Sequence, residues 1–327
     1  MKIFKSVVLT ALASAVAFFP VNSPGLSVSA AKAEECTHSK WGKDDEIGAA
    51  NYVSPERTLA ATKLVKKGES HPLGIVVNPG MPAFPPRSLS LQVVAPGQNN
   101  GRDTTQDFGW PASYNDDIAQ LWFGIGPQID GLGHLGEKNM YYNCNRGKDI
   151  VHITGLKKLG LEKVPPLISR GVLIDMAKHK GVEAMAGGQA ITEADVKDAM
   201  AAQNVTINEG DVVLIHTGWT DAKLESAPKE WVSIEPGLDN AASAYLASLN
   251  PMAVGADTWG LEVVPPAKGD RVFYGHVELL AKRGIFILET MNTGRLAAEG
   301  VNEFMFVLGH ARITGSVQMI INPVAMW

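Results

Sequence analysis

The first side chains with possible chemistry are Asp130 and His134, which lie four residues apart in the glycine-rich stretch 128–136. Glycine tolerates the backbone angles of a tight turn, so a turn here could bring a carboxylate and an imidazole together. Such a pair could contribute two ligands to a metal ion. Asp and Gly are also ordinary residues of polar surface turns, and that alternative stays open.

Glu289 is a more informative acid because it follows the apolar run 284–288, which predicts a buried strand. Burying a lone carboxylate costs on the order of several kcal/mol, so Glu289 needs a cation or hydrogen-bond donors. His276 lies shortly before it and could share such a site. An ion pair of Glu289 with Arg283 or Arg295 is the plain alternative.

Two further polar groups follow predicted strands. His216 comes after the apolar run 212–215, and Asp257 comes after 253–256. Strand ends in α/β proteins carry functional loops, although a core histidine bonded to backbone explains His216 equally well. The remaining histidines have no such setting and are predicted to be surface or structural residues: His38, His71, His152, His179 and His310.

Strands and helices must alternate to position these groups. Ser54-Pro55-Glu56 predicts a helix start, and Thr192 with Asp195 predicts another. Residues 88–94 alternate between apolar and polar, which is typical of a half-buried strand. Further elements are predicted as strands at 168–174, 212–215, 253–256, 285–288 and 317–321, a helix at 241–249, and a surface loop at 97–107. This mixture indicates an α/β protein with one catalytic unit.

The N-terminus has the pattern of an export leader. Lys2 and Lys5 precede a 13-residue apolar run, 7–19, and small residues suited to cleavage follow at 28–33. The run is too short to span roughly 30 Å of hydrocarbon as a helix, which takes about 20 residues. We therefore expect residues 1–30 to be a signal peptide and the mature protein to be periplasmic or secreted.

The net charge of the mature chain indicates its class of partner, and its cysteine content allows one disulfide. Loss of residues 1–30 removes two lysines, so 27 basic and 34 acidic side chains remain. This acidic balance disfavours nucleic acid and anionic membranes; we expect a small-molecule substrate and a homo-oligomer. The two cysteines, Cys36 and Cys144, would be able to pair in an oxidising compartment, or could stay as free thiols.

Several segments in order resemble the cyclase family of metal-dependent hydrolases, which includes kynurenine formamidase and isatin hydrolase. The segment 44–56, DDEIGAANYVSPE, resembles the family's opening motif, and 79–85, PGMPAFP, resembles one of its loops. VLIHTGW at 213–219, GAD at 255–257, and the segments around His276 and Glu289 complete the match, which covers about residues 40–325.

The resemblance implies a fold and a domain plan. The fold is a swivelling β/β/α-type α/β structure with a mixed, barrel-like sheet and flanking helices. The catalytic domain spans 41–327, and residues 31–40 form a flexible N-terminal segment between it and the leader.

The chain departs from the family's metal motif, H-x-G-T-H-x-D-x-P-x-H. Aligned on His134, the first histidine is Asp130, the aspartate is Gly136, and the last histidine is Met140. Asp130 can still bind a metal, whereas Gly136 cannot and Met140 cannot act as a base. We therefore predict one divalent ion, Zn²⁺ or Mn²⁺, held by the mixed carboxylate and imidazole set Asp130, His134, His276 and Glu289.

The implied reaction is hydrolysis of an amide, formamide or lactam C–N bond by water that the ion activates. His276, His134 and Glu289 are the predicted catalytic residues, and His276, if it does not bind the ion, is the natural proton carrier. Aromatic residues around the motif are predicted to line the substrate pocket, although such residues are more often plain core: Trp110, Phe123, Tyr141 and Tyr142.

Two other functions remain open. The losses at Gly136 and Met140 favour a non-catalytic metal- or small-molecule-binding protein on the same fold. A metal-dependent cyclase or dehydratase is the second rival, because a fold does not fix a reaction.

Overall fold

A computed structural model describes residues 36–94 and 105–327. The predicted signal peptide, residues 31–35 of the predicted N-terminal segment, and most of the predicted loop 97–107 lie outside the described residues. From Cys36 onward the chain forms one compact unit. No helix in these two ranges is long and apolar enough to cross a membrane.

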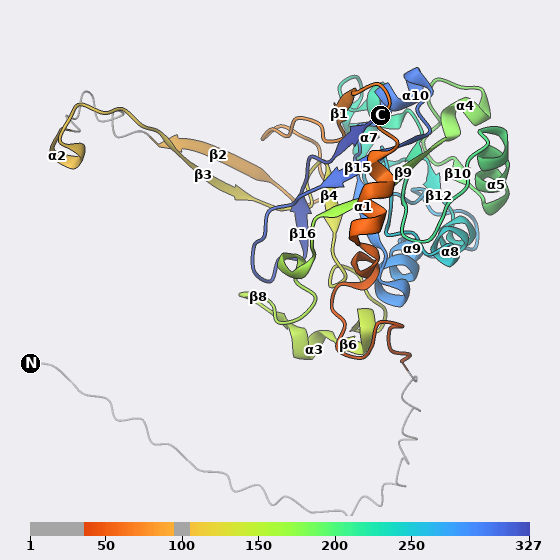
Figure 1. The fold of residues 1–327 in the computed structure, drawn as a ribbon, viewed down its shortest axis with the longest axis horizontal. Coiled ribbons are helices and arrows are strands. Elements are labelled where there is room, and N and C mark those ends of the chain that lie inside the picture. Colours follow the sequence, from red (N-terminus) through yellow and green to blue (C-terminus); the bar gives the residue numbers. More distant parts are fainter. Residues whose placement is uncertain (1–35, 95–104) are drawn as a thin grey trace, which may run out of the picture. The chain divides into compact units, whose positions relative to one another are not determined.

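A mixed nine-stranded sheet organises this unit (Figure 1). Its strand order is β1-β17-β15-β9-β11-β13-β14-β4-β16, and β9, β11, β13 and β14 run parallel at its centre. The outer strands pair antiparallel. The strands are β1 (Ser70–Pro72), β4 (Gln128–Asp130), β9 (Leu167–Asp175), β11 (Val212–His216), β13 (Ala253–Ala256), β14 (Phe286–Glu289), β15 (Glu303–Leu308), β16 (Gln318–Ile320) and β17 (Val324–Met326). The α/β class with a mixed, curled sheet is thus confirmed.

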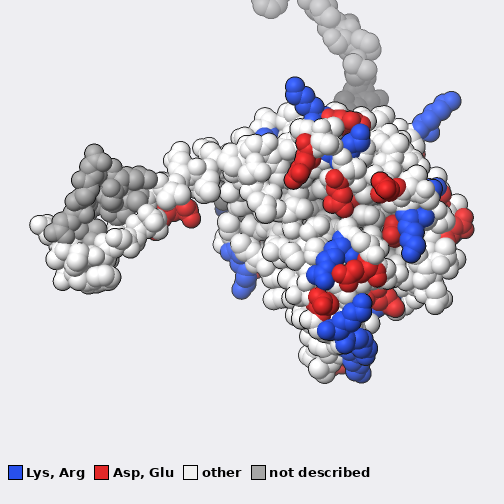
Figure 2. Space-filling view, turned by 90° about the horizontal axis from the view of Figure 1, so that it is seen from above, with Lys and Arg blue, Asp and Glu red and all other residues white. Residues whose placement is uncertain are grey.

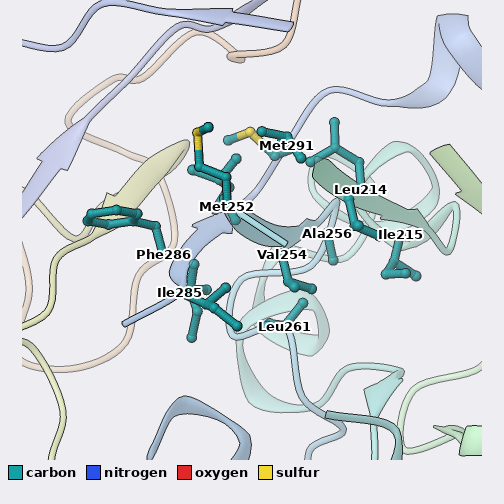
Figure 3. Packing of buried hydrophobic residues seen from close by; sticks show 14 of the residues in the cluster. Leu214, Ile215, Met252, Val254, Ala256, Leu261, Ile285, Phe286 and Met291 are labelled. Atoms are coloured by element: carbon teal, nitrogen blue, oxygen red, sulfur yellow. The ribbon is translucent and has the colours of Figure 1, made fainter. Parts of the chain in front are cut away.

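The parallel strands are apolar because layers cover both of their faces. Every residue of β11, β13 and β14 is buried. Leu214, Val254 and Phe286 from these strands pack with Met252 and Met291 in the core shown in Figure 3. The short apolar runs in the sequence therefore predicted the centre of the sheet correctly.

Helices cover the sheet and begin at capping side chains. Ser54 accepts a hydrogen bond from the Arg57 backbone N–H at the start of α1 (Pro55–Thr62), which packs on β9 and β15. Thr192 and Asp195 form the predicted capping box of α5 (Glu193–Ala202). The other helices are α4 (Met176–Lys180), α6 (Trp219–Lys223), α7 (Pro228–Ser233), α8 (Asn240–Ser248), α9 (Tyr274–His276), which continues into the π-helix η5 (Val277–Arg283), and α10 (Gly294–Glu299).

Short elements complete the described residues. The two-stranded pairs are β2 (Leu89–Val94) with β3 (Asp116–Leu121), β5 (Met140–Tyr141) with β6 (Asn145–Arg146), β7 (Val151–His152) with β8 (Gly155–Leu156), and β10 (Ala190–Ile191) with β12 (Gly237–Leu238). The remaining turns are η1 (Gly48–Tyr52), α2 (Thr105–Phe108), η3 (Tyr142–Cys144), α3 (Gly147–Ile150) and η4 (Leu161–Lys163).

The prediction of a half-buried strand at 88–94 is wrong in one respect. β2 forms, but its side chains are exposed on both faces apart from the half-buried Leu89. β2 pairs with β3 alone, and this two-stranded ribbon lies outside the nine-stranded sheet (Figure 1). Among the described residues, none buries the side chains of β2 beyond Leu89.

Cys36 and Cys144 form a disulfide, which resolves the alternative left open by the sequence. The neighbouring Ser39 backbone N–H and His38 Nδ1 both contact Asn143 Oδ1. The described part of the predicted flexible segment 31–40, from Cys36 on, is therefore fastened to η3.

Candidate metal centre

The strand register places four polar side chains on one face of the sheet. In the antiparallel pair β4–β14, Glu289 lies opposite Gln128 and Ile287 lies opposite Asp130. In β4–β16, Gln318 lies opposite Asp130. Because directly paired residues and residues two apart share a face, Gln128, Asp130, Glu289 and Gln318 point the same way. A sheet formed by distant segments thus gathers the two acids.

Asp130 is fully buried with one oxygen unsatisfied. Its Oδ1 accepts hydrogen bonds from Gln128 Nε2 at 3.1 Å and from Gln318 Nε2 at 2.7 Å. Its Oδ2 has no hydrogen-bond partner, and lies 3.6 Å from His276 Nε2. A buried carboxylate oxygen left this way costs free energy unless a proton or cation occupies the space beside it.

His276 closes the group from the end of α9. Glu262 Oε1 lies 2.7 Å from its Nδ1 and also accepts the His276 backbone N–H, while Glu262 Oε2 accepts the Gly275 N–H. The opposite ring nitrogen, Nε2, lies 3.2 Å from Glu289 Oε1. Although burial opposes protonation of this ring, its bonds to the carboxylates of Glu262 and Glu289 raise the His276 pKa well above its usual value.

Glu289 is buried at the end of β14. Its Oε2 accepts a hydrogen bond from Gln128 Nε2 at 2.6 Å. Burial, followed by repulsion from Asp130, raises the pKa of the Glu289 carboxyl to about 7. The ion-pair alternative is wrong, because Arg283 lies beside Glu278 and Arg295 pairs with Glu69 and Glu299.

Asp130, His276 and Glu289 each offer one ligand atom within 4.8 Å of the other two. His134 lies at the margin of this triad: its Nε2 is 3.9 Å from Asp130 Oδ2, and its ring centroid is 6.3 Å from that of His276. Burial, with repulsion from His276 and Arg87, lowers the His134 pKa despite the nearby Asp130. The structure therefore brings all four predicted ligands together, with three of them in a tight group.

A small hollow adjoins the triad through Gln128 and Thr290. Phe84 stacks near Trp259 in its wall, with 5.8 Å between ring centroids, and Trp231 lies there as well. Arg87 also lines it and donates to the Gly124 carbonyl oxygen at 2.6 Å. The hollow combines aromatic walls with one guanidinium.

The four predicted substrate residues lie elsewhere. Trp110 is 62% exposed in the segment between α2 and β3. Tyr142 is buried, and its hydroxyl lies within 2.6 Å of both Asp45 Oδ2 and Ser39 Oγ, which makes it a structural residue. Phe123 and Tyr141 are partly buried and pack against the core. None of the four lines the described hollow: Trp110 is exposed, and the other three take packing positions.

His216 and Asp257 form a separate buried cluster. His216 Nδ1 lies 2.8 Å from Thr293 Oγ1 and 3.7 Å from Asp257 Oδ2. Asp257 Oδ1 accepts from the backbone and the hydroxyl of Thr217. Their hydrogen bonds fasten the ends of β11 and β13 to each other, which favours the structural explanation of His216.

Gly136 has a steric reason for lacking a side chain. A Cβ there would lie 2.2 Å from the Met140 carbonyl oxygen, closer than real Cβ atoms come. The loop from β4 to β5 turns back on itself at this point, with the Glu137 N–H bonded to the Met140 oxygen. An aspartate at position 136 would not fit this backbone.

The sequence did not predict the roles of Glu262, Gln128, Gln318, Phe84 and Trp231. Glu262 and Phe84 lie in irregular loops, where no periodicity marks a buried side chain. Gln128 begins the glycine-rich stretch already singled out, so its position carried a weak indication. Gln318 required knowledge of the pairing of β16 with β4.

Comparison with known proteins places the chain in a family. The model of the Cyclase family matches residues 70–263. No curated protein matches the chain. Among solved structures, one described as a novel cyclase is 29% identical, has a TM-score of 0.79, and aligns over 88% of this chain and 98% of its own.

Two further structures are more distant and share the fold. Isatin hydrolase A from Labrenzia aggregata is 17% identical, with a TM-score of 0.56, covering 83% of this chain and 98% of its own. A predicted metal-dependent hydrolase from Bacillus stearothermophilus is 16% identical, with a TM-score of 0.51, covering 80% and 98%.

Proposed function

Because the chain belongs to the cyclase family, we propose that it is a metal-dependent hydrolase that cleaves the C–N bond of an amide, formamide or lactam. The carrying observation is the buried triad of Asp130, His276 and Glu289, whose ligand atoms lie within 4.8 Å of one another. Structures described as isatin hydrolase and as metal-dependent hydrolase share the fold.

The residues present fit a divalent cation. Asp130 Oδ2 is buried and unsatisfied, and it faces a ring nitrogen and a second buried carboxylate. Two carboxylates and an imidazole suit Zn²⁺ or Mn²⁺ better than a metal that prefers thiolates. Asp130, His276 and Glu289 would hold the ion, and His134 would lie beside it.

When bound, a divalent ion supplies Lewis acidity, which polarises a carbonyl oxygen and lowers the pKa of water. Glu262 keeps His276 oriented, since its carboxylate binds Nδ1 and leaves Nε2 facing the triad. Gln128 and Gln318 hold the two carboxylates by their outer oxygens. Glu262, Gln128 and Gln318 thus orient the three ligand side chains by hydrogen bonds to atoms that would not bind the ion.

His134 is the residue best placed to move a proton. Its lowered pKa keeps the imidazole neutral at neutral pH, so it can accept a proton from water. Hydrolysis adds the water oxygen to the carbonyl carbon, breaks the C–N bond and delivers a proton to the leaving nitrogen. Since His276 has both ring nitrogens engaged, we assign this proton transfer to His134.

The hollow beside the triad has a volume of about 10 Å³, room for about one water, so an aromatic or acyl substrate would bind there only as Phe84 and Trp259 move apart. Phe84 and Trp259 would stack on a planar group, while Arg87 would bind a carbonyl or carboxylate oxygen. Removal of the guanidinium by Arg87→Met would raise KM more than it lowers kcat.

The test is metal analysis of purified protein, followed by hydrolysis assays with aryl formamides, isatin-like lactams and simple esters after adding Zn²⁺ or Mn²⁺. We expect turnover of a C–N substrate that Asp130→Asn abolishes and that Glu225→Gln, at an exposed acid, leaves unchanged. Ion binding without turnover of any substrate class would favour the alternative, a metal- or small-molecule-binding protein, for which Gly136 and Met140 argue.

A further inference from the structure

A second cavity lies at the other end of the parallel strands from the metal centre. Pro251 and Ile285, which line it, come just before β13 and β14, whereas Glu289 is the last residue of β14. The volume of this cavity is about 190 Å³, against about 10 Å³ for the hollow beside the triad. A protein cavity of roughly 150 Å³ can hold benzene, so this one has room for a single aromatic ring.

Aromatic side chains form part of the cavity wall. Trp41 and Tyr52 pack edge to face, with 5.2 Å between their ring centroids, and Tyr142 lies in the wall with them. Pro251 and Ile285 add apolar surface. Aromatic rings prefer offset-stacked or edge-on contact with other rings, so these walls favour a planar, aromatic ligand.

The charge around the cavity is of one sign. Acidic and basic side chains intermix over the face of the molecule shown in Figure 2. The cavity, in contrast, is lined by Lys40, Lys282 and Arg283, and none of its described lining residues is acidic. Glu209 pairs with Lys40 and Glu278 pairs with Lys282, each at 2.8 Å.

Arg283 is the least engaged of these three cations. Its Nε lies 3.7 Å from Glu278 Oε1, and its Nη1 and Nη2 have no hydrogen-bond partner among the described residues. The guanidinium therefore has free N–H donors in a planar fork, which matches the two oxygens of a carboxylate. The cavity thus combines an aromatic wall with one cation that lacks a close partner.

The segment that follows Cys36 builds one side of the cavity, because residues 37–41 line it. The disulfide joins Cys36 to Cys144, and the Ser39 backbone N–H donates a hydrogen bond to Asn143 Oδ1 at 2.9 Å. Both contacts fasten the segment to η3. The shape of the cavity therefore depends on the disulfide.

We propose that this cavity is a second binding site, which takes a small carboxylate that carries one aromatic ring. The carboxylate binds the Arg283 guanidinium, and the ring packs against Trp41 and Tyr142. Arg283 ends η5, whose carboxyl end repels anions, so the guanidinium has to carry the recognition of charge. The site needs no metal ion, and its test does not depend on the proposed hydrolase activity.

Isothermal titration calorimetry of chelator-treated protein with benzoate provides the first test. We expect one benzoate per chain, bound at least about tenfold more tightly than benzyl alcohol, which lacks the charge, and acetate, which lacks the ring. Arg283→Met should weaken benzoate binding about tenfold or more. Arg87→Met, which removes the guanidinium beside the triad, should leave it unchanged. No binding, or a loss in Arg87→Met and not in Arg283→Met, would overturn the proposal.

Nuclear magnetic resonance of the unaltered protein locates the ligand without relying on a variant that has to bind. The indole N–H signal of Trp41, assigned with Trp41→Phe, should shift as benzoate is added. The signal of Trp259, in the wall of the hollow, should stay in place. A shift at Trp259 and none at Trp41 would put the ligand at the metal centre and disprove the second site.

The dependence on the disulfide has its own test. The double variant Cys36→Ser, Cys144→Ser should bind benzoate several-fold more weakly than the wild-type protein, since residues 37–41 are then held by hydrogen bonds alone. Thermal unfolding of the same sample establishes that the variant is folded. Equal affinity in a folded double variant would show that the disulfide does not shape the site.

Discussion

Glu262 Oε1 lies 2.7 Å from His276 Nδ1, and this contact turns the other ring nitrogen toward Asp130 and Glu289. A carboxylate behind a ligating histidine fixes both the tautomer and the orientation of the ring. The metal centre therefore extends one layer beyond the side chains that would touch an ion, into the loop before α9.

Replacing Glu262 by Gln should weaken metal binding about 10- to 100-fold, because His276 loses the partner that orients it. Competition with a chromophoric chelator measures this affinity. Glu225→Gln is the matched control, since Glu225 is an exposed acid outside this site. Unchanged affinity in Glu262→Gln would remove Glu262 from the site.

We expect one tightly bound divalent ion per chain, because Gly136 replaces the aspartate best placed to bridge two metals. Elemental analysis of the purified protein measures the stoichiometry. Asp130→Asn and Glu289→Gln should each reduce it below 0.1 equivalents by removing a ligand from the triad (about a tenfold or greater loss). Two tight equivalents in the wild-type protein would contradict the single-ion site.

The ion-free protein should lose stability as the pH rises. Burial and Asp130 raise the folded-state pKa of Glu289 to about 7, from an ordinary 4.5. A raised pKa means that the folded state binds the proton more tightly, so this stabilisation is complete below about pH 4.5 and is lost by about pH 7. The change is on the order of 3 kcal/mol. His276, whose pKa is also raised, acts with the same sign.

Urea unfolding of chelator-treated protein at pH 5 and pH 8 measures the effect. Glu289→Gln has no charge to lose and should flatten the dependence. Adding the divalent ion should restore stability at pH 8 in the wild-type protein only, because the ion replaces the proton between the carboxylates. A stability that increases from pH 5 to pH 8 without metal would mean that Glu289 is not protonated in the folded state.

The sequence predicted the elements of the fold better than the contacts of the site. Strands such as β11 and β13 are short apolar runs in the sequence, because a strand that is buried on both faces has apolar residues at successive positions. The meeting of Asp130 with Glu289 depends on the pairing of β4 with β14, across more than 150 residues, which no local pattern encodes. It was predicted from the family resemblance and from the need of a buried carboxylate for a cation.

Where the prediction failed, the cause was a local pattern with more than one structural outcome. The alternation at 88–94 correctly indicated a strand, but β2 pairs with β3 alone, so its side chains beyond Leu89 are exposed. The substrate role of the aromatic residues near Asp130 stays a prediction. Tyr142 is buried and donates a hydrogen bond to Asp45, and Phe84, from a distant loop, lines the hollow beside the triad.

Gly136→Ala should destabilise the protein by about 1–3 kcal/mol, because the new methyl group collides with the Met140 carbonyl oxygen. Thermal unfolding measures the change. Gly309→Ala is the control, since nothing lies within 4 Å of a Cβ at that position. Equal melting temperatures for both variants would show that the β4–β5 loop adapts, and would reopen the question of an aspartate at position 136.

When the full-length chain is expressed in a bacterium with residues 1–30 in place, the mature protein should begin between residues 31 and 34 and lie outside the cytoplasm. The pattern of Lys2, Lys5 and the apolar run 7–19 is the basis. N-terminal sequencing of protein from the periplasmic or culture fraction measures it. Recovery of a chain that still starts at Met1 would disprove export.

The Cys36–Cys144 disulfide restricts the cellular compartment in which the protein can acquire its full covalent structure. It joins residues 108 positions apart, and the closed loop contains α1, β2, β3, β4 and the Asp130–His134 turn. Disulfides persist in oxidising compartments and are reduced in the cytosol. A copy retained in the cytosol would thus keep its two cysteines as thiols, and the segment before Asp45 would lose its covalent fastening to η3. The complete covalent structure of this part of the molecule, with the disulfide formed, is therefore expected only in an oxidising compartment.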